Sequence, residues 1–230
     1  MKIRPVILCG GAGTRLWPKK KNYQAKQFID FGGWSLIQKT LERVKNSIFD
    51  YPIISTNLKY LKDIRKSLKK NKVRKYKIVL EPVKKNTAPA ILSSALIKDI
   101  PLKQPLMYFA ADHLIEKSNI LNKSINKNKS NLDDQNIFIF GIKPTNPSSE
   151  YGYFLTKKIK KNINKVTKFI EKPKASKAKQ IIKSKGYWNS GMFYLRKDSI
   201  INNFKKYQNK TYKSCLEAVN KAKYRNNTYY

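Results

Sequence analysis

Short apolar runs alternate with amphipathic segments through the first half of the chain. An apolar run at 6–9 is followed, from Ser35, by a segment whose apolar residues recur at intervals of four, three and four positions, at Ile37, Leu41, Val44 and Ile48. These intervals place the four side chains on one face of a helix, and Ser35 with Gln38 forms a capping-box start. The alternation continues with strands expected at 52–56, 77–82 and 105–113 and helices at 61–68 and 87–100. This order predicts an α/β fold with a mostly parallel sheet flanked by helices.

The pattern changes after Asn136. The segments NIFIFGI, YGYFLTKK, VTKFIEKP and GMFYLR predict shorter strands with fewer helices between them. We therefore expect a mixed sheet in a single domain, 1–230, made of two halves, 1–135 and 136–230. The segment 119–136 is expected to be a surface helix or loop, and the lysine-rich block 157–165 a loop beside a strand. The polar end of the chain predicts no closing strand, and an exposed sheet edge would favour association between copies.

The composition is typical of a folded domain, with 40% hydrophobic residues in a chain of 230. No apolar run reaches the roughly 18 residues that a membrane-spanning helix needs. Glycines interrupt the N-terminal run before it could serve as a signal peptide, so the expected location is the cytoplasm, away from membranes. Cys9 and Cys215 lie far apart and have no Cys or His at metal-ligand spacing, which predicts two plain thiols.

The formal net charge is +36, with 50 Lys and Arg residues against 14 Asp and Glu. Clustered basic residues bind the phosphates of nucleic acids. Only seven of the 50 are arginine, however, and the lysines are spread over nearly every segment beside many asparagines. A compositional bias that fills solvated surfaces is therefore favoured over selection for a nucleic-acid partner.

A glycine-rich turn follows the first apolar run, in the stretch VILCGGAGTRLWPKKKNYQAKQF at 6–28. Glycine leaves room for a phosphate to approach backbone N–H groups, and it permits positive φ. The spacing does not match the P-loop, and Leu16 stands where the dinucleotide fingerprint has its third glycine. From these residues alone, a phosphate-binding loop and a tight strand-to-helix connection both remain open, and the loop is favoured.

Six motifs in one order resemble those of the sugar-1-phosphate nucleotidyltransferases, and of the mannose-1-phosphate guanylyltransferases among them. They are GGAGTRLWP with KQF, EPVKKNTAPA, AADH, FGIKPTNPSSEYGYF, FIEKP and YWNSGMF, and they extend over most of the chain. The resemblance implies a Rossmann-like nucleotidyltransferase fold. It also implies transfer of GMP from GTP to mannose 1-phosphate with Mg²⁺, which releases pyrophosphate and gives GDP-mannose for polysaccharide biosynthesis.

The resemblance also assigns roles to residues of this sequence. The nucleotide would lie against Gly10, Gly11, Gly13 and Thr14, and the guanine would be bound by Glu81 and Asn86. The catalytic residues would be Arg15 and Lys26, which hold phosphates, and Asp112, which binds Mg²⁺. The sugar phosphate would be held by Gly152, Glu171, Lys172 and Asn189. The single histidine, His113, is expected to be structural, because a sugar phosphate is already an anion and needs no general base.

The sequence departs from the family pattern in several places. Ala25 stands for the family's proline before KQF, and Lys85 for its arginine before NTAPA. The family's second metal-binding aspartate and its C-terminal domain are not found, and Asp198 is too close to the WNSG turn to be that aspartate. Two alternatives therefore stay open: a catalytically inactive nucleotide-binding or regulatory chain that needs a partner, and a transferase that acts on another hexose 1-phosphate.

Overall fold

The computed structural model describes residues 1–11, 25–83, 86–160 and 163–230, which form two compact units. The first unit comprises Met1–Ile137 and Tyr194–Tyr230, and the second comprises Phe138–Phe193. The expected division at 135 and 136 lies within two residues of the first boundary. Residues 194–230, which the prediction placed in the second half, lie in the first unit.

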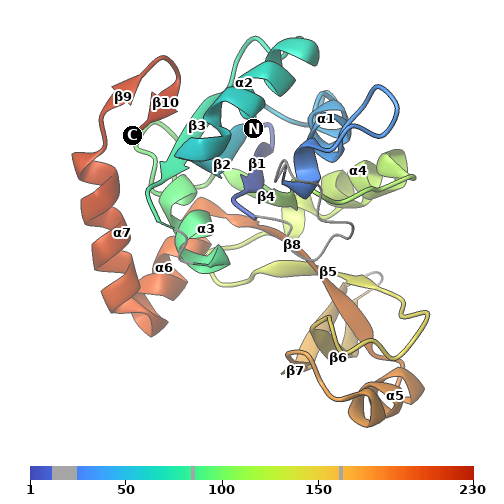
Figure 1. Ribbon diagram of the computed structural model, residues 1–230. Coiled ribbons are helices and arrows are strands. Elements are labelled where there is room, and N and C mark those ends of the chain that lie inside the picture. Colours follow the sequence, from blue (N-terminus) through green and yellow to red (C-terminus); the bar gives the residue numbers. More distant parts are fainter. Residues whose placement is uncertain (12–24, 84–85, 161–162) are drawn as a thin grey trace. The chain divides into compact units, whose positions relative to one another are not determined.

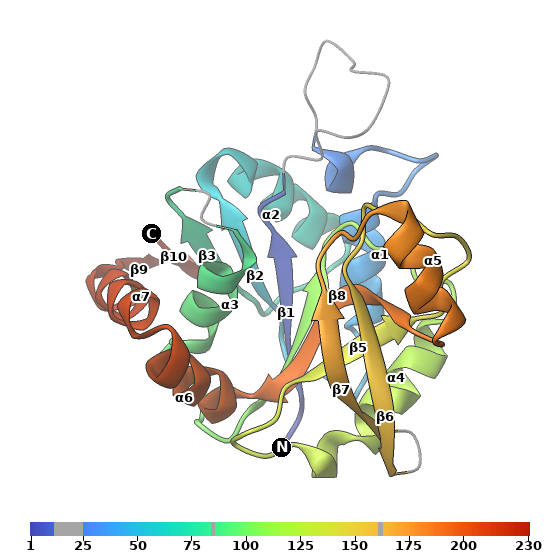
Figure 2. The ribbon, with the colours of Figure 1, turned by 90° about the horizontal axis from the view of Figure 1, so that it is seen from below.

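The first unit is an α/β structure, as the periodicity predicts. Its sheet has the strand order β4-β1-β2-β3-β10-β9, and the first four of these strands are parallel. The strands lie side by side in Figure 2. They are β1 (Arg4–Cys9), β2 (Ile53–Asn57), β3 (Lys77–Glu81) and β4 (Pro105–Ala110), with β9 (Tyr224–Arg225) and β10 (Thr228–Tyr229) at the end of the chain.

The first three helices of this unit begin where the periodicity predicts, although the first and the third end about one turn early. The fourth lies in the segment expected to be a helix or loop, and no bounds were predicted for the last two. The helices are α1 (Leu36–Arg43), α2 (Leu61–Lys70), α3 (Thr87–Ala95), α4 (Ser118–Lys127), α6 (Lys197–Tyr207) and α7 (Asn209–Lys221), with 3-10 turns η1 (Lys26–Phe28), η2 (Leu58–Tyr60) and η3 (Lys129–Asn131). The predicted capping box is present, and the backbone N–H of Ser35 donates to Gln38 Oε1 at 2.8 Å. Right-handed crossovers place α1 and α2 on one face of the sheet and α3 on the other, so both faces are covered, as Figure 1 shows for α2 and α3.

The prediction that no strand closes the chain is wrong. Strand β10 pairs in parallel with β3, with Thr228 opposite Ile78, and it pairs in the antiparallel direction with β9. The turn between β9 and β10 is made by Asn226 and Asn227, both at positive φ, which is the conformation that a two-residue hairpin requires. The sheet therefore continues past β3 with two short strands.

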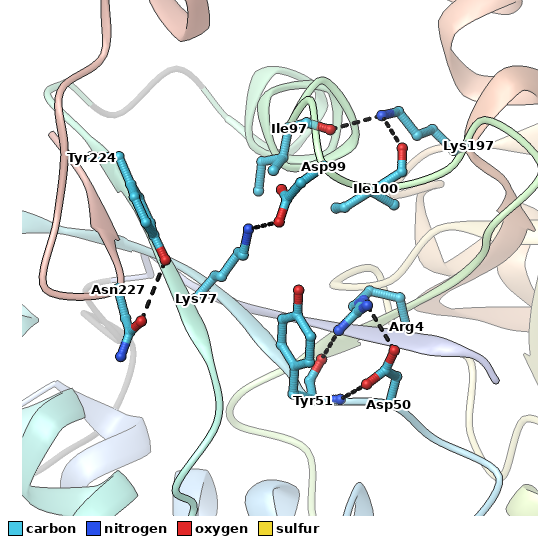
Figure 3. Close-up of polar contacts among 10 residues, drawn as sticks. All are labelled: Arg4, Asp50, Tyr51, Lys77, Ile97, Asp99, Ile100, Lys197, Tyr224 and Asn227. Atoms are coloured by element: carbon cyan, nitrogen blue, oxygen red, sulfur yellow. Dashed lines mark hydrogen bonds and ion pairs between the residues drawn. The ribbon is translucent and has the colours of Figure 1, made fainter.

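Lys77 on β3 contacts this hairpin through the aromatic rings of the two strands. Its Nζ forms an ion pair with Asp99 and lies 5.4 Å from the ring centre of Tyr224 (Figure 3). The ring centre of Tyr229 is 5.7 Å from the same atom. The ammonium group is thus held by one carboxylate and by two aromatic faces that come from the hairpin. Tyr224 also donates its hydroxyl to Asn227 Oδ1 at 3.3 Å. These contacts explain how two strands of two residues each remain paired.

The second unit is mainly antiparallel. It contains β5 (Phe138–Ile142), β6 (Tyr153–Lys160), β7 (Ile163–Ile170), α5 (Ala175–Lys183) and β8 (Tyr187–Arg196), whose last three residues belong to the first unit. The order is β7-β6-β8, with β5 also paired with β8. The prediction of a loop at 157–165 is wrong: the described residues of this block lie in β6 and β7, and the lysines belong to an exposed two-stranded ribbon.

Candidate active site

The predicted nucleotide residues of the first unit gather at one edge of its sheet. Gly10 follows β1, Glu81 ends β3, and Asp112 comes two residues after β4. These strands are parallel, so their carboxyl ends meet at the same edge, which is where α/β sheets bind ligands. Strand topology therefore brings together residues that lie far apart in the sequence.

Glu81 lies against the backbone of Gly10. A Cβ atom at Gly10 would be 3.5 Å from Glu81 Oε1, so the carboxylate occupies the space beside the glycine. The same Oε1 atom accepts a hydrogen bond of 2.7 Å from Ser55 Oγ on β2, and the Asn57 side chain donates to the Glu81 carbonyl at 3.0 Å. The structure thus joins two predicted site residues and fixes one of them by two contacts.

Burial raises the pKa of Glu81, and the hydrogen bond from Ser55 opposes that rise. Ser55 therefore helps to keep the carboxylate ionised in a half-buried position. Sequence reasoning missed Ser55 and Asn57. The only signal was that polar residues end the otherwise apolar run PIISTN, in a strand that is buried on both faces.

Gln27 supports the start of the glycine-rich loop. Its side chain is buried, and Nε2 donates to the Gly11 carbonyl at 3.1 Å. This contact connects the KQF motif with the glycines that precede it in the sequence. Gly13, Thr14 and Arg15, which the resemblance places in this loop, lie outside the described residues.

Lys26 and Asp112 form the charged part of the site. Lys26 Nζ lies 3.5 Å from Asp112 Oδ2, and the two side chains are 35% and 40% exposed. The structure therefore brings together two of the three predicted catalytic residues. Both groups are half exposed, so a phosphate from solvent can reach either of them.

Asp112 can serve as one ligand of a divalent cation. The described part of the chain holds no group of three or more His, Cys, Asp or Glu side chains that could enclose a metal. Mg²⁺ commonly uses one or two carboxylates and takes its other ligands from water and substrate phosphates. A half-exposed carboxylate at a strand end fits that mode of binding, whereas it does not fit a metal held by protein alone.

His113 is half-buried behind Asp112. Burial lowers the pKa of the imidazole, the charges of Arg43 and Lys26 lower it further, and Asp112 opposes them. The His113 carbonyl accepts a hydrogen bond of 3.1 Å from Arg43 Nη2. The expected structural role of His113 is thus carried by its backbone, and its ring is neutral at neutral pH.

Asn86 stands at the N-cap of α3, with φ 64°, and its side chain makes no capping hydrogen bond. The residue is exposed, so its amide group is accessible to a ligand at the start of the helix. Residues 84–85, including Lys85 of the motif, lie outside the described residues. The role of Asn86 in binding guanine stays a prediction.

Three of the four predicted sugar-phosphate residues meet within the second unit. A Cβ atom at Gly152 would be 2.8 Å from Glu171 Oε2, so the carboxylate lies directly over the glycine backbone. The Asn189 N–H donates to the Gly152 carbonyl at 2.8 Å, and Asn189 Oδ1 accepts from the Gly191 N–H at 3.1 Å. Lys172 follows Glu171 at φ 43° and is exposed. Gly152 before β6, Glu171 after β7 and Asn189 within β8 thus form one polar cluster.

The sequence profile of the family described as Nucleotidyl transferase matches residues 4–229. The chain therefore belongs to the nucleotidyl transferase family. Mannose-1-phosphate guanylyltransferase RfbM of Salmonella typhimurium is 34% identical over 225 residues, which are 95% of this chain and 47% of that protein. The alginate biosynthesis protein AlgA of Pseudomonas fluorescens is 31% identical over 95% of this chain and 46% of its own length. The chain thus spans about half the length of these curated relatives.

Solved structures agree with the fold. A crystal structure described as mannose-6-phosphate isomerase from Helicobacter pylori is 29% identical, with a TM-score of 0.81 over 97% of this chain and 81% of that one. One described as mannose-1-phosphate geranyltransferase from Thermus thermophilus has a TM-score of 0.82 at 23% identity over 97% and 66% of the two chains, a likeness that concerns the fold alone. Among the residues that the structure describes, no helix is long and apolar enough to span a membrane.

Proposed function

We propose that the chain transfers GMP from GTP to mannose 1-phosphate, with release of pyrophosphate and formation of GDP-mannose. The observation that carries the proposal is the Glu81 carboxylate, which Ser55 holds beside Gly10 at the carboxyl end of the sheet. Guanine presents two adjacent donors, N1–H and the exocyclic amine, and a carboxylate accepts from both. Adenine presents an acceptor at N1 instead, so the same carboxylate disfavours ATP.

The charged pair in the same unit accounts for the phosphates. Lys26 would neutralise the α-phosphate and the attacking sugar phosphate as a point charge, and Asp112 would hold the cation that accompanies the triphosphate. Mg²⁺, when bound, would neutralise charge on the triphosphate and on the leaving pyrophosphate. Lys26 is also the ion-pair partner of Asp112, so the two charges already lie together before the substrates arrive.

The reaction exchanges one phosphorus–oxygen bond for another. An oxygen of the sugar phosphate attacks the α-phosphorus of GTP, and the bond between that phosphorus and the β-phosphate oxygen breaks. The attacking oxygen already carries negative charge, so no proton has to be removed and no general base is needed. The work of the protein is therefore to align two anions and to offset their charge.

The cluster in the second unit supplies the contacts for the hexose. Glu171 presents a carboxylate beside Gly152, and Asn189, whose backbone N–H binds the Gly152 carbonyl, carries a side-chain amide; such groups hydrogen-bond sugar hydroxyls. Lys172 adds a cation for the phosphate of the sugar. The names of the curated relatives, mannose-1-phosphate guanylyltransferases, favour mannose among the hexoses.

The test is pyrophosphate release from GTP and mannose 1-phosphate with Mg²⁺, by the purified chain and by Lys26→Ala and Asp112→Ala. We expect each variant to lower kcat by about a hundredfold or more, because each removes a charge that the reaction requires. Lys45→Ala is the matched control, since Lys45 also pairs with a carboxylate, that of Glu42, on the exposed side of α1. Folded protein that binds no GTP would overturn the proposal; GTP binding without turnover would favour the chain that needs a partner.

A further inference from the structure

Helix α1 ends with an arginine whose guanidinium is buried and has no counter-ion among the described residues. Arg43 is 5% exposed, and no carboxylate of the described residues pairs with it. Its donors go to neutral oxygens: Thr40 Oγ1 at 3.3 Å, Ser118 Oγ at 3.4 Å and the His113 carbonyl at 3.1 Å. Burial lowers the pKa of Arg43 to about 10, so the group is still charged at neutral pH.

A buried charge that meets only neutral partners is costly for a fold. An apolar side chain of similar length would fill the same space without that cost. The contacts of Arg43 therefore call for an explanation beyond the packing of α1, and two of the three lie on the segment that follows Asp112.

Asp112 stands between two anchored neighbours. The N–H of Ala111 donates to the Leu8 carbonyl at 3.1 Å, which extends the pairing of β4 with β1 by one residue. On the other side, the His113 carbonyl is held by Arg43 from α1. The backbone on both sides of the carboxylate is thus fixed, on one side by the sheet and on the other by a single side chain.

Arg43 holds the far end of the same connection as well. Ser118, the first residue of α4, accepts from Arg43 Nε and donates to the Ile115 carbonyl at 3.0 Å. Asn122, one turn further along α4, donates to the carbonyl of Arg43 at 3.4 Å. The segment between β4 and α4 is therefore attached to α1 at its beginning and at its end.

We propose that Arg43 is a positioning residue for Asp112: by holding the His113 carbonyl it fixes the turn after β4, and with it the direction in which the Asp112 carboxylate points. The inference rests on the proposed role of Asp112 as a ligand of the divalent cation. A guanidinium suits the task because its rigid fork of donors can reach the carbonyl and the two hydroxyls at once, which a lysine cannot do.

The experiment measures binding of Mn²⁺, as a paramagnetic substitute for Mg²⁺, to the GTP complex of the chain, by the loss of the free-ion electron paramagnetic resonance signal. The protein is kept in large excess over GTP, so that little free GTP is left to chelate the ion. The variants are Arg43→Met, Arg43→Lys, Asp112→Asn and the double variant Arg43→Met with Asp112→Asn. We expect Arg43→Met to weaken Mn²⁺ binding about tenfold, since groups that orient metal ligands are worth about 10- to 100-fold in metal affinity. Arg43→Lys keeps the charge and one donor, so its loss is smaller.

Arg4→Met is the matched control. Arg4 is also buried in this unit, but it binds Asp50 and the Tyr51 carbonyl near the amino end of β1, away from Asp112 (Figure 3). We expect Arg4→Met, which leaves Asp50 without its partner, to lower the melting temperature and to leave Mn²⁺ affinity unchanged. All affinities are compared at a temperature at which circular dichroism shows each variant to be folded.

The double variant separates positioning from general damage. If Arg43 acts through Asp112, Arg43→Met has no further effect on Mn²⁺ affinity once Asp112 is replaced by Asn. A further tenfold loss in that background would overturn the inference, and so would wild-type affinity in Arg43→Met beside a clear loss in Asp112→Asn. If Asp112→Asn itself leaves the affinity unchanged, Asp112 is not the ligand, and that part of the proposed function fails together with the inference.

Discussion

Replacement of Glu81 by Gln tests how the site selects its nucleotide. The change keeps the length of the side chain and exchanges one carboxylate oxygen for an amide NH₂. Ser55 Oγ donates at 2.7 Å to Oε1 of the native side chain, so the amide oxygen of the introduced glutamine would keep that bond. The NH₂ group would then stand where Glu81 offers its second oxygen to guanine, and a donor would face a donor.

The expected loss follows from one hydrogen bond to a charged group. Such a bond contributes about 1.5–3 kcal/mol, which corresponds to about 10- to 150-fold in the dissociation constant of GTP. The fold itself is not expected to suffer. Burial raises the pKa of Glu81 above its unfolded value, so the ionised carboxylate destabilises the folded state above that unfolded pKa. A neutral Gln removes this cost, and the melting temperature at pH 7 should stay level or rise.

The assay is isothermal titration calorimetry with GTP, ITP and ATP. ITP lacks the exocyclic amine of guanine but keeps N1–H, so the ratio of GTP to ITP affinity reports the contact with the amine. We expect Glu81→Gln to weaken GTP binding and to reduce the preference for GTP over ITP. Glu42→Gln, which changes an exposed glutamate on α1, should alter neither value. GTP affinity within twofold of the wild type, or an unchanged ratio, would refute the assignment of Glu81 to guanine.

Three further predictions concern other parts of the chain. Gly152→Ala should raise the KM for mannose 1-phosphate about tenfold, the equivalent of one hydrogen bond. Its melting temperature should change little, because the new Cβ would displace only the exposed ends of Glu171 and Phe169. Gly186→Ala, whose Cβ would meet the Ile181 backbone, should instead destabilise the second unit. Ser55→Ala removes the hydrogen bond that opposes the raised pKa of Glu81, so Glu81 should take up its proton at a higher pH than in the wild type. When GTP affinity is measured from pH 8 down to pH 5, its decline should therefore begin at a higher pH in the variant; an unchanged profile would contradict this role of Ser55. Lys77→Met should lower the free energy of unfolding by about 1 kcal/mol and speed amide exchange at Thr228 and Tyr229, whereas the exposed Lys66→Met on α2 should not.

The regular part of the fold was predictable because its helices and strands bury one face or two. The intervals of Ile37, Leu41 and Val44 predicted α1, and all three side chains are buried. The capping box at Ser35 was predictable for a related reason, since it is a local contact between residues three apart.

Elements with two solvated faces were not predictable in this way. Strands were predicted at YGYFLTKK and VTKFIEKP, but the block 157–165 was predicted to be a loop, because its exposed lysines at 157, 158 and 165 hide the apolar alternation that indicates a strand. The closing hairpin has strands of two residues and an Asn-Asn turn in place of the usual glycine, and its stability comes from Lys77, which lies far earlier in the chain. Neither feature leaves a pattern within a short window of sequence.

The candidate site shows the same limit. Motifs identified Gly10, Glu81 and Asp112, but the residues that hold them in place are set by strand register and helix packing. Ser55 is 26 positions from Glu81, and Arg43 is 70 positions from His113. Such distant partners follow only from the three-dimensional arrangement, because nothing about a serine in a strand or an arginine in a helix indicates its contact.

The most direct test of the central claim is phosphorus nuclear magnetic resonance of the reaction of GTP with mannose 1-phosphate, Mg²⁺ and the purified chain. We expect the signals of both substrates to decline together while those of a nucleotide-sugar diphosphate and of pyrophosphate grow in equal amounts. Formation of GDP and inorganic phosphate, or of pyrophosphate and GMP without consumption of mannose 1-phosphate, would show hydrolysis instead of transfer and would contradict the account.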